Sequence, residues 1–488
     1  MTFDKVSDLA KRRGFIWGPS PNIYNGGVSG FYDWGINGKL LKNKVELVIR
    51  KGFSSYSFFE VESPTIMPKI VWEASGHYSN FFDFTVECKK CRSTYRADNL
   101  IKESLPNEKV ILEISSLEKQ IKKIKCPNCK SSLEGIKKYS LMMSTIIGSD
   151  KESFLRPETA TTTYLLYPEY YRFFRTKLPF GVFQIGKAYR NEVSPRQHVF
   201  RTREFTQAEA QLFILKKDKS NFSLSDLKTK LPLLSYDKKD PLDIEMEKAL
   251  KNKLLKSKAY ASVLEIAYEI ITNIGLDKKR IRIKQHHPDE LAHYALDAWD
   301  IEYKTERFGW MEVCGVHDRQ DYDLKRHSEY SKTKFPGEIP HILEIACGVE
   351  RLTYCLLENS FMEEKDRVWL QFPRGMGPID VAVLPLIQKD DLPEKAKEIF
   401  KTLEKDFVCL YDETGSIGRR YARNDEIGTT ITCTIDHMSL KEGTITLRDV
   451  YTTRQIRVKI SDLKKVIESI MDGEDFLKLG KEVHTRVK

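Results

Sequence analysis

Alternation between polar and apolar residues is clearest in residues 181–212. At the two-residue period of a strand, the second half of this stretch has one polar face and one small or apolar face. The first face carries Phe205, Gln207, Glu209 and Gln211, and the second carries Thr206, Ala208, Ala210 and Leu212. In the first half, Arg190 and Glu192 share a face. We therefore predict a hairpin whose polar face is a ligand floor or the solvated edge of a sheet.

Several helices and strands follow from the same kind of pattern. Helical spacing of apolar residues predicts a helix that stops at Gly14 and an amphipathic helix over 39–50. Residues 58–64 alternate as a strand that a proline closes. The lysine-rich stretch 223–275 is predicted to be helical, with its regularly spaced apolar residues in the core.

Three later strands are predicted over 297–304, 309–315 and 341–346, and Arg319 is expected in a short loop after the second. A helix should begin near Val349, which places Arg351 in its first turn. A strand, a glycine and the positive end of a helix that bears an arginine together form a phosphate site.

The pattern of predicted elements changes after Gly377. Strands and amphipathic helices alternate to the end of the chain, which predicts a separate α/β domain. Its basic segment 418–423 includes Arg419, Arg420 and Arg423. A basic helix face of this kind is typical of an RNA contact or of an ordinary solvated surface.

Composition narrows the class of protein. The 488 residues suffice for two to four domains, and 41% hydrophobic with 31% charged residues is typical of a soluble globular protein. The formal net charge of +10 is compatible with a polyanionic partner. We found neither an apolar signal core at the amino terminus nor a run long enough to span a bilayer, so we expect a cytoplasmic protein with no membrane partner.

Four of the nine cysteines form two C-x-x-C pairs, with 34 residues (92–125) between them and a helix predicted over about 107–125. Each pair is a tight knuckle whose thiolates can point at one ion, and four thiolates complete the closed shell of a structural zinc site. We therefore predict that Cys88, Cys91, Cys126 and Cys129 bind one Zn²⁺.

Ordered segments along nearly the whole chain resemble the class II aminoacyl-tRNA synthetases, and among them the homodimeric glycyl-tRNA synthetases. They include YNGGVSGFYDWG (24–35), LRPETA (155–160), AYRNEVSPR (188–196), RTREFTQAEAQLF (201–213), GVHDRQDYDL (315–324) and DETGSIGRRYARNDEIGT (412–429). The resemblance implies ATP-dependent attachment of glycine to its tRNA by a homodimeric ligase.

The resemblance also implies an architecture. The expected fold is an α+β catalytic core with an antiparallel sheet, a small zinc-binding insertion and a C-terminal α/β anticodon-binding domain. Residues 1–80 would begin the catalytic domain and carry motif 1, which builds the dimer interface. Residues 81–150 would be the zinc insertion. Residues 151–372 would complete the catalytic domain with motifs 2 and 3 and a helical insertion at about 215–280, and residues 373–488 would bind the anticodon.

Roles toward ATP follow from matched motif positions. Arg190 would bridge the α-phosphate and the glycine carboxylate, and Arg201 and Arg351 would hold the distal phosphates. Glu192 would meet the adenine amino group, and Phe205 would stack on the adenine. Mg²⁺ would accompany ATP, near carboxylates on the Glu192 side or at Glu209 or Glu344.

Roles toward glycine are implied in the same way. Glu209, Glu312 and Glu344 would bind the ammonium group, Arg319 the carboxylate end, and Glu158 would be a weaker candidate. The chain departs from the family at Ala346, where a serine hydroxyl is usual, and this loss weakens the inference of glycine recognition. Three other functions stay open: a noncatalytic synthetase-like subunit that binds nucleic acid, a related synthetase for another small amino acid, and a zinc-ribbon RNA-binding protein.

Overall fold

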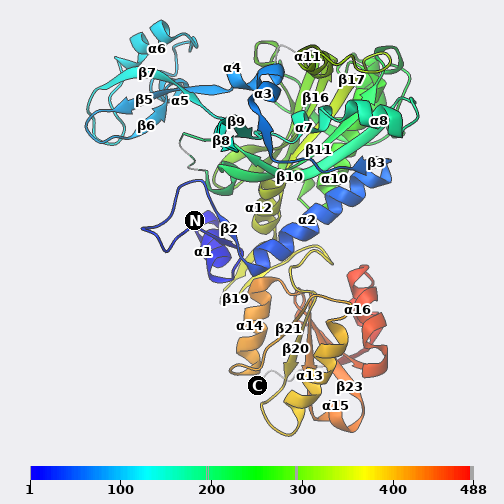
Figure 1. Cartoon of the computed structure of the whole chain (residues 1–488). Helices are drawn as coiled ribbons and strands as arrows, with labels where there is room; N and C mark the ends of the chain where they lie inside the picture. Colours follow the sequence, from blue (N-terminus) through cyan, green and yellow to red (C-terminus); the bar gives the residue numbers. More distant parts are fainter. Residues whose placement is uncertain (1, 194, 196, 292–294, 366, 484–488) are drawn as a thin grey trace.

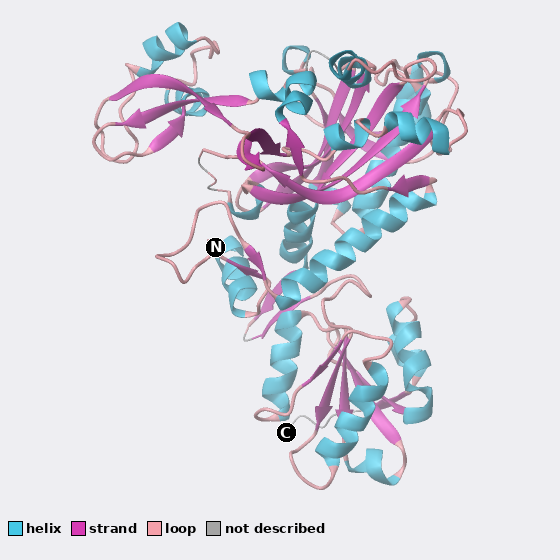
Figure 2. Cartoon of the chain, in the orientation of Figure 1, coloured by secondary structure: helices cyan, strands magenta, loops and turns pink. Residues whose placement is uncertain are grey.

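We describe the chain from a computed structural model, which covers all residues except 1, 194, 196, 292–294, 366 and 484–488. Figure 1 shows a large sheet with helices at the top, a small module projecting from one side and a second α/β unit below. Figure 2 shows how helices and strands segregate into these parts.

The large sheet has nine strands and is antiparallel except at two pairings. The β3 strand runs parallel to β10, and β12 runs parallel to β14. The strand order is β13 (Leu242–Glu245), β12 (Lys230–Leu234), β14 (Ile281–Gln285), β15 (Asp297–Thr305), β16 (Gly309–Gln320), β17 (His341–Gly348), β11 (Glu204–Ile214), β10 (Phe180–Tyr189) and β3 (Phe58–Glu60).

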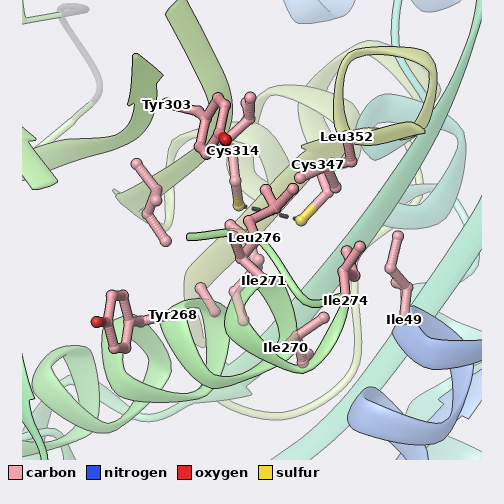
Figure 3. Close-up of a cluster of buried hydrophobic side chains, with 14 of the residues drawn as sticks. Ile49, Tyr268, Ile270, Ile271, Ile274, Leu276, Tyr303, Cys314, Cys347 and Leu352 are labelled. Atoms are coloured by element: carbon pink, nitrogen blue, oxygen red, sulfur yellow. Dashed lines mark hydrogen bonds between the residues drawn. The ribbon is translucent and has the colours of Figure 1, made fainter. Parts of the chain in front are cut away.

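Three helices pack on one face of this sheet: α2 (Ile36–Ser55), α10 (Lys258–Asn273) and α12 (Val349–Ser360). Ser257 caps α10 by accepting a hydrogen bond from the backbone N–H of Tyr260. Figure 3 shows Ile270 and Ile271 of α10, with Ile274 directly after the helix, beneath Cys314 and Cys347, which come from neighbouring strands. This apolar side holds the core and leaves the other face of the sheet available for polar side chains.

The opposite side carries shorter helices. They are α3 (Lys69–Ser75), α4 (His77–Asn80), α7 (Ala160–Tyr164), α8 (Tyr167–Phe173) and α11 (Tyr322–Ser331). A three-stranded sheet of β4 (Ile66–Pro68), β9 (Lys151–Leu155) and β8 (Met143–Ile147) lies between them and the projecting module.

The projecting module has its own small core. A three-stranded sheet in the order β6 (Thr94–Arg96), β5 (Phe82–Cys88) and β7 (Leu133–Ser140) packs against α5 (Ala97–Ser104) and α6 (Ile114–Ile121). The predicted helix over about 107–125 is therefore present only as the shorter α6, and α5 was not predicted.

The C-terminal unit holds a six-stranded mixed sheet with a separate core. Its strands, in order, are β21 (Cys409–Tyr411), β20 (Val381–Pro385), β22 (Ile431–Ile435), β23 (Thr444–Asp449), β24 (Gln455–Lys459) and β25 (Lys481–Val483). Four helices accompany them: α13 (Leu392–Leu403), α14 (Ile417–Ile427), α15 (His437–Lys441) and α16 (Leu463–Met471).

The two large units meet through α2 and a short hairpin. Lys44 Nζ of α2 lies 2.5 Å from Asp380 Oδ1, and α14 packs on β19 (Arg367–Leu370), the partner of β18 (Phe361–Glu364). Beside α2, the amino-terminal segment contributes α1 (Thr2–Arg12), β1 (Ile16–Trp17) and β2 (Asp33–Trp34), so the predicted first helix ends before Gly14.

Three sequence expectations about local structure were wrong. The stretch at about 215–280 is not wholly helical, because β12 and β13 extend the large sheet and α9 (Met246–Lys251) is short. Arg319 lies inside β16 rather than in a loop after it. The strand predicted over 58–64 covers only β3, three residues long.

Candidate active site

A cavity of about 330 Å³ lies over the polar face of the large sheet. Its lining brings together all the residues that the sequence assigned to ATP or to glycine. They are Glu158, Arg190, Glu192, Arg201, Phe205, Glu209, Glu312, Arg319, Glu344, Ala346 and Arg351. Residues from widely separated parts of the chain thus converge on one pocket.

Strand register explains this convergence. In the ladder between β11 and β17, Glu209 is opposite Ala346 and Gln211 is opposite Glu344. In the next ladder, Gly315 is opposite Ala346 and His317 is opposite Glu344. Because alternate residues share a face, these polar groups form one continuous floor across three strands.

Arginines gather at one end of the pocket. The guanidinium carbon of Arg190 lies 5.3 Å from the ring centroid of Phe205, and its Nε donates to the carbonyl of Pro157 at 3.0 Å. Arg201 Nε lies 2.6 Å from Glu192 Oε2. Arg351, in the first turn of α12, donates to the carbonyls of Phe200 and Glu312. Backbone carbonyls hold Arg190 and Arg351 in place and the Glu192 carboxylate holds Arg201, as a preorganised anion site requires.

Carboxylates gather at the other end, around Glu344. Tyr164 donates its hydroxyl to Glu344 Oε2 at 2.7 Å, and His317 Nδ1 lies 3.1 Å from Oε1. Arg319 Nη1 donates to both Glu344 oxygens at 3.3 and 3.4 Å, and its Nε and Nη2 donate to the Asp323 carboxylate at 2.9 and 3.0 Å. Glu344 is therefore held rigidly by three neighbours.

The buried acids differ sharply in pKa. Burial raises the pKa of Glu209 to about 8, and the nearby charges of Glu344 and Glu158 push it the same way. For Glu344, burial opposes ionisation, but Arg319 and His317 outweigh it and lower the pKa to about 2. The pKa of Glu158 also falls well below its usual value, because His77 and Arg319 outweigh burial. Glu209 is thus the acid that exchanges a proton near neutral pH.

The segment 155–160 packs on the polar face of the sheet and braces the floor. Arg156 is 2% exposed and donates to the carbonyls of Lys187 and Ser63. A Cβ at Gly186 would lie 2.2 Å from Arg156 Nη2, so the close approach of this side chain requires a glycine there. Thr159 stands at the N-cap of α7, but its hydroxyl donates to Glu209 Oε2 at 2.5 Å and does not cap the helix.

Sequence reasoning missed residues that line the pocket or support its floor from the apolar side of the sheet. Lys42 of α2 is buried and reaches Glu350, which also accepts from the backbone N–H of Thr206 at 2.7 Å. His286 and His317 line the pocket as well. The burial of Lys42 could have been predicted only from its position beside Leu41, on the apolar face of an amphipathic helix.

The four predicted zinc ligands form a compact cluster. Cys88 Sγ lies 3.4 Å from Cys129 Sγ, and Cys91 Sγ lies 3.6 Å from Cys126 Sγ. All four cysteines are free of disulfides, and their sulfur atoms lie within 4.8 Å of one another. A tetrahedral Zn²⁺ with bonds of about 2.3 Å separates its sulfurs by about 3.8 Å, so the cluster fits this ion.

Both knuckles share one backbone design. The N–H of Cys88 donates to the carbonyl of Ser93, and the N–H of Cys126 donates to the carbonyl of Ser131. Each knuckle also has one residue at positive φ, Arg92 at 59° and Lys130 at 61°. Two equivalent turns thus present two thiols each toward a common centre.

The three C-terminal arginines have different surroundings. Arg419 is exposed on α14, and Arg423 is half-buried against Asp412 at 2.5 Å. Arg420 is 2% exposed and donates to the carbonyls of Pro385, Leu386 and Gly415. The prediction of Arg420 as an RNA contact was wrong, because its guanidinium is used to tie the start of α14 to the end of β20.

Among the residues that the structure describes, no helix combines the length and apolar character needed to cross a membrane.

Two family models match parts of the chain. Residues 144–234 match the tRNA synthetase class II core domain (G, H, P, S and T), and residues 380–470 match the anticodon binding domain. A solved structure titled as the RNA binding domain of threonyl-tRNA synthetase from Cryptosporidium parvum superposes with a TM-score of 0.61 at 16% identity, over 95% of this chain and 97% of that one. The class II fold predicted from the sequence is therefore confirmed.

Curated relatives match over nearly the full length. Glycine–tRNA ligase of Methanocaldococcus jannaschii is 37% identical over 94% of this chain and 97% of its own. The enzyme of the same name from Pyrococcus abyssi is 38% identical, over 96% and 99%, and that of Thermococcus kodakarensis is 37% identical, over 96% and 98%. The chain therefore belongs to the glycine–tRNA ligase family of class II aminoacyl-tRNA synthetases.

Proposed function

We propose that this protein activates glycine with ATP and transfers it to the 3′ end of its tRNA. The observation that carries the proposal is the polarity of one cavity, which has arginines at one end and buried carboxylates at the other. The phosphate chain of ATP needs the positive charge of the arginines, and a small ammonium ion needs the negative charge of the carboxylates.

In the first step, a glycine carboxylate oxygen attacks the α-phosphorus and the bond to pyrophosphate breaks. Arg190 bridges the two anions through its planar guanidinium, and Arg201 and Arg351 hold the outer phosphates. Phe205, already stacked near Arg190, receives the adenine ring. Glu192 exchanges its contact with Arg201 for the adenine amino group. Mg²⁺ that accompanies ATP would supply positive charge against the phosphates, and the carboxylates that line the cavity are the residues that would hold it.

Glycine binds at the acidic end. Glu158, Glu209 and Glu344 surround its ammonium group, with Glu312 at the pocket edge. Arg319 keeps Glu344 in place and supplies positive charge near the carboxylate. A pocket for glycine must exclude larger side chains, and Ala346 is among the residues that line this one. In the second step, a ribose hydroxyl of the tRNA attacks the activated carbonyl and AMP leaves.

The parts of the chain divide this work as the sequence predicts. Residues 1–80 and 151–372 form the catalytic domain, 81–150 bind a structural Zn²⁺ through their four cysteines, and 373–488 bind the tRNA anticodon. Exposed Arg419 and half-buried Arg423 lie on the helix that would face RNA. The match of this region to the anticodon binding domain supports its role.

Two copies of the chain pair through α2 and the sheet edge. Phe59 of the edge strand β3 is 51% exposed, and Leu47 of α2 and Phe173 of α8 are also exposed. Exposed apolar groups on adjoining elements are typical of an association surface. Sedimentation should give a dimer, and Phe59→Asp should shift it toward monomer, whereas a monomeric native chain would refute this part of the proposal.

The decisive experiment is glycine-dependent exchange of pyrophosphate into ATP, measured with purified protein and a panel of small amino acids. Exchange with glycine alone supports the proposal. Exchange with alanine, serine, threonine or proline instead would reassign the substrate. No exchange with any amino acid would favour the noncatalytic nucleic-acid-binding alternative.

A further inference from the structure

Two histidines on the wall of the active-site pocket and one aspartate beside them form a cluster that the proposed reaction does not use. They are His286, directly after β14, Asp300 of β15 and His317 of β16, and the two histidines line the pocket. Their ligand atoms all lie within 4.8 Å of one another, and His286 Nε2 is 2.7 Å from Asp300 Oδ2. From this geometry we propose that His286, Asp300 and His317 bind one divalent transition-metal ion such as Zn²⁺, with a fourth coordination position open to the pocket.

Strand pairing places the three groups together. In the β15–β16 ladder, Asp300 is opposite Gly315, and His317 follows Gly315 by two residues on the same face. The backbone N–H of His286 pairs with the carbonyl of Ala298, two residues before Asp300. Strands β15 and β16 and the residue directly after β14 therefore each present one ligand, as a preorganised metal site requires.

Gly315 creates the space for this arrangement. A Cβ at this position would lie 2.7 Å from Cε1 and 3.2 Å from Nε2 of His317, and 3.4 Å from Oδ1 of Asp300. The imidazole edge that carries Nε2 thus lies directly over the glycine, on the side where Asp300 approaches. A larger residue would force His317 away from Asp300.

His317 also has the outer partner that metal-bound histidines usually have. Its Nδ1 lies 3.1 Å from Glu344 Oε1. When a carboxylate accepts a hydrogen bond from the Nδ1–H group, the free lone pair of the imidazole is on Nε2, which is then available to the ion. Glu344 is itself fixed by Tyr164 and Arg319, so its contact with Nδ1 fixes the orientation of the His317 imidazole.

The chemistry and field of the site suit a cation of borderline softness. Two imidazoles and one carboxylate are the ligand set of open zinc sites, which keep a fourth position for water or substrate. Ligands at about 2.0–2.1 Å from a tetrahedral ion are separated by about 3.4 Å, so small side-chain rotations close the cluster. Glu290 and Glu312 line the same part of the pocket and add negative charge.

The open fourth coordination position is inferred from the exposure of the two histidines to the cavity. His286 and His317 line the cavity and keep 27% and 26% of their side-chain surface accessible, whereas the thiols of Cys88 and Cys126 are fully covered. Four cysteine ligands complete the shell of a tetrahedral ion, so the cysteine cluster is a closed structural site, whereas the three ligands of the histidine cluster leave a position open to the pocket. Because only the first site has thiolate ligands, the two sites have distinct spectra with Co²⁺.

The test is a Co²⁺ titration of the full-length protein after metal removal, followed by absorption spectroscopy. The thiolate site gives an intense sulfur-to-cobalt charge-transfer band, and the proposed site gives only ligand-field bands. We expect two equivalents in the native protein and one in His317→Ala and Asp300→Asn, with the thiolate band unchanged. His287→Ala, which removes an exposed neighbouring imidazole, should retain two.

Azide tests the open position, because it binds only an ion with a free site and should shift the ligand-field bands of native protein alone. Uptake of one equivalent by the native protein would overturn the proposal, and so would a second equivalent that survives both substitutions. Unshifted bands with azide would overturn the open fourth position. Since the readout is metal uptake, it stays independent of whether glycine exchange occurs.

Discussion

Lys42 Nζ lies 2.5 Å from Glu350 Oε1, and both side chains are almost completely buried. The ammonium group also donates to Thr206 Oγ1 at 2.7 Å, and Glu350 Oε2 accepts from the backbone N–H of Thr206. Lys42 comes from α2, Thr206 from β11 and Glu350 from the first turn of α12. One ion pair therefore joins the helix on the apolar side of the sheet to the strand that forms the pocket floor.

We expect Lys42→Met to destabilise the protein by about 3–5 kcal/mol, because it leaves the Glu350 carboxylate buried without its partner. Denaturant unfolding, followed by tryptophan fluorescence, measures this change. Lys39→Met is the matched control, since Lys39 lies on the same helix with 53% of its side chain exposed and should change stability by less than about 1 kcal/mol. Equal effects of the two substitutions would contradict the importance of the buried pair.

Arg190→Ala should reduce glycine-dependent pyrophosphate exchange by at least about a hundredfold, the usual loss when one preorganised donor is removed from a developing charge. Arg190→Lys should also lose most activity, because an ammonium group cannot bridge two anions in a plane. Arg172→Ala serves as the control, since Arg172 is 70% exposed on α8. Near-normal exchange by a folded Arg190→Ala protein would refute the assignment.

Periodicity predicted the pocket floor but not the buried charges around it. The faces of Glu209 and Gln211 follow from a period of two, which one strand determines locally. The burial of Lys42 and Arg420 depends on which distant carboxylate or carbonyl meets them, and a lysine or arginine on a helix is normally exposed. Local propensity misjudged β12 as well, because Pro232 argues against a strand that the sheet nevertheless pairs on both sides.

Glycine affinity should rise with pH below the Glu209 pKa of about 8. Burial keeps this carboxyl protonated in the free protein, and an ammonium ion binds the carboxylate, so glycine binding must release the proton. Calorimetry should show affinity increasing by up to about tenfold per pH unit below that pKa and levelling off above it. The same calorimetry in buffers of different ionisation enthalpy measures how many protons are released when glycine binds, and this number checks the mechanism.

Glu209→Gln should bind glycine weakly and without this slope. A pH-independent affinity in the native protein would show that Glu209 is already ionised before glycine arrives.

Cys126→Ser should empty the thiolate site and unfold the module built from β5, β6 and β7. Four thiolates share one ion, and removal of one ligand weakens a site whose metal supplies folding energy. The zinc content should fall by about one equivalent per chain relative to the native protein, and amide exchange should accelerate in β5–β7. Cys409→Ser, in the C-terminal unit, should leave both quantities unchanged. A Cys126→Ser protein that keeps the full zinc content of the native chain would refute the ligand assignment.

Arg419 and Arg420 are adjacent in sequence but should respond oppositely to alanine. Arg419 is exposed on α14, so Arg419→Ala should weaken tRNA binding with little change in stability and should reduce the slope of log affinity against log salt by about one. Arg420 is buried and donates to three backbone carbonyls, so Arg420→Ala leaves those carbonyls unsatisfied and should lower stability by about 1–3 kcal/mol or more. Filter binding at several salt concentrations and denaturant unfolding separate the two effects. If Arg419→Ala leaves the salt slope unchanged, tRNA does not contact this end of α14.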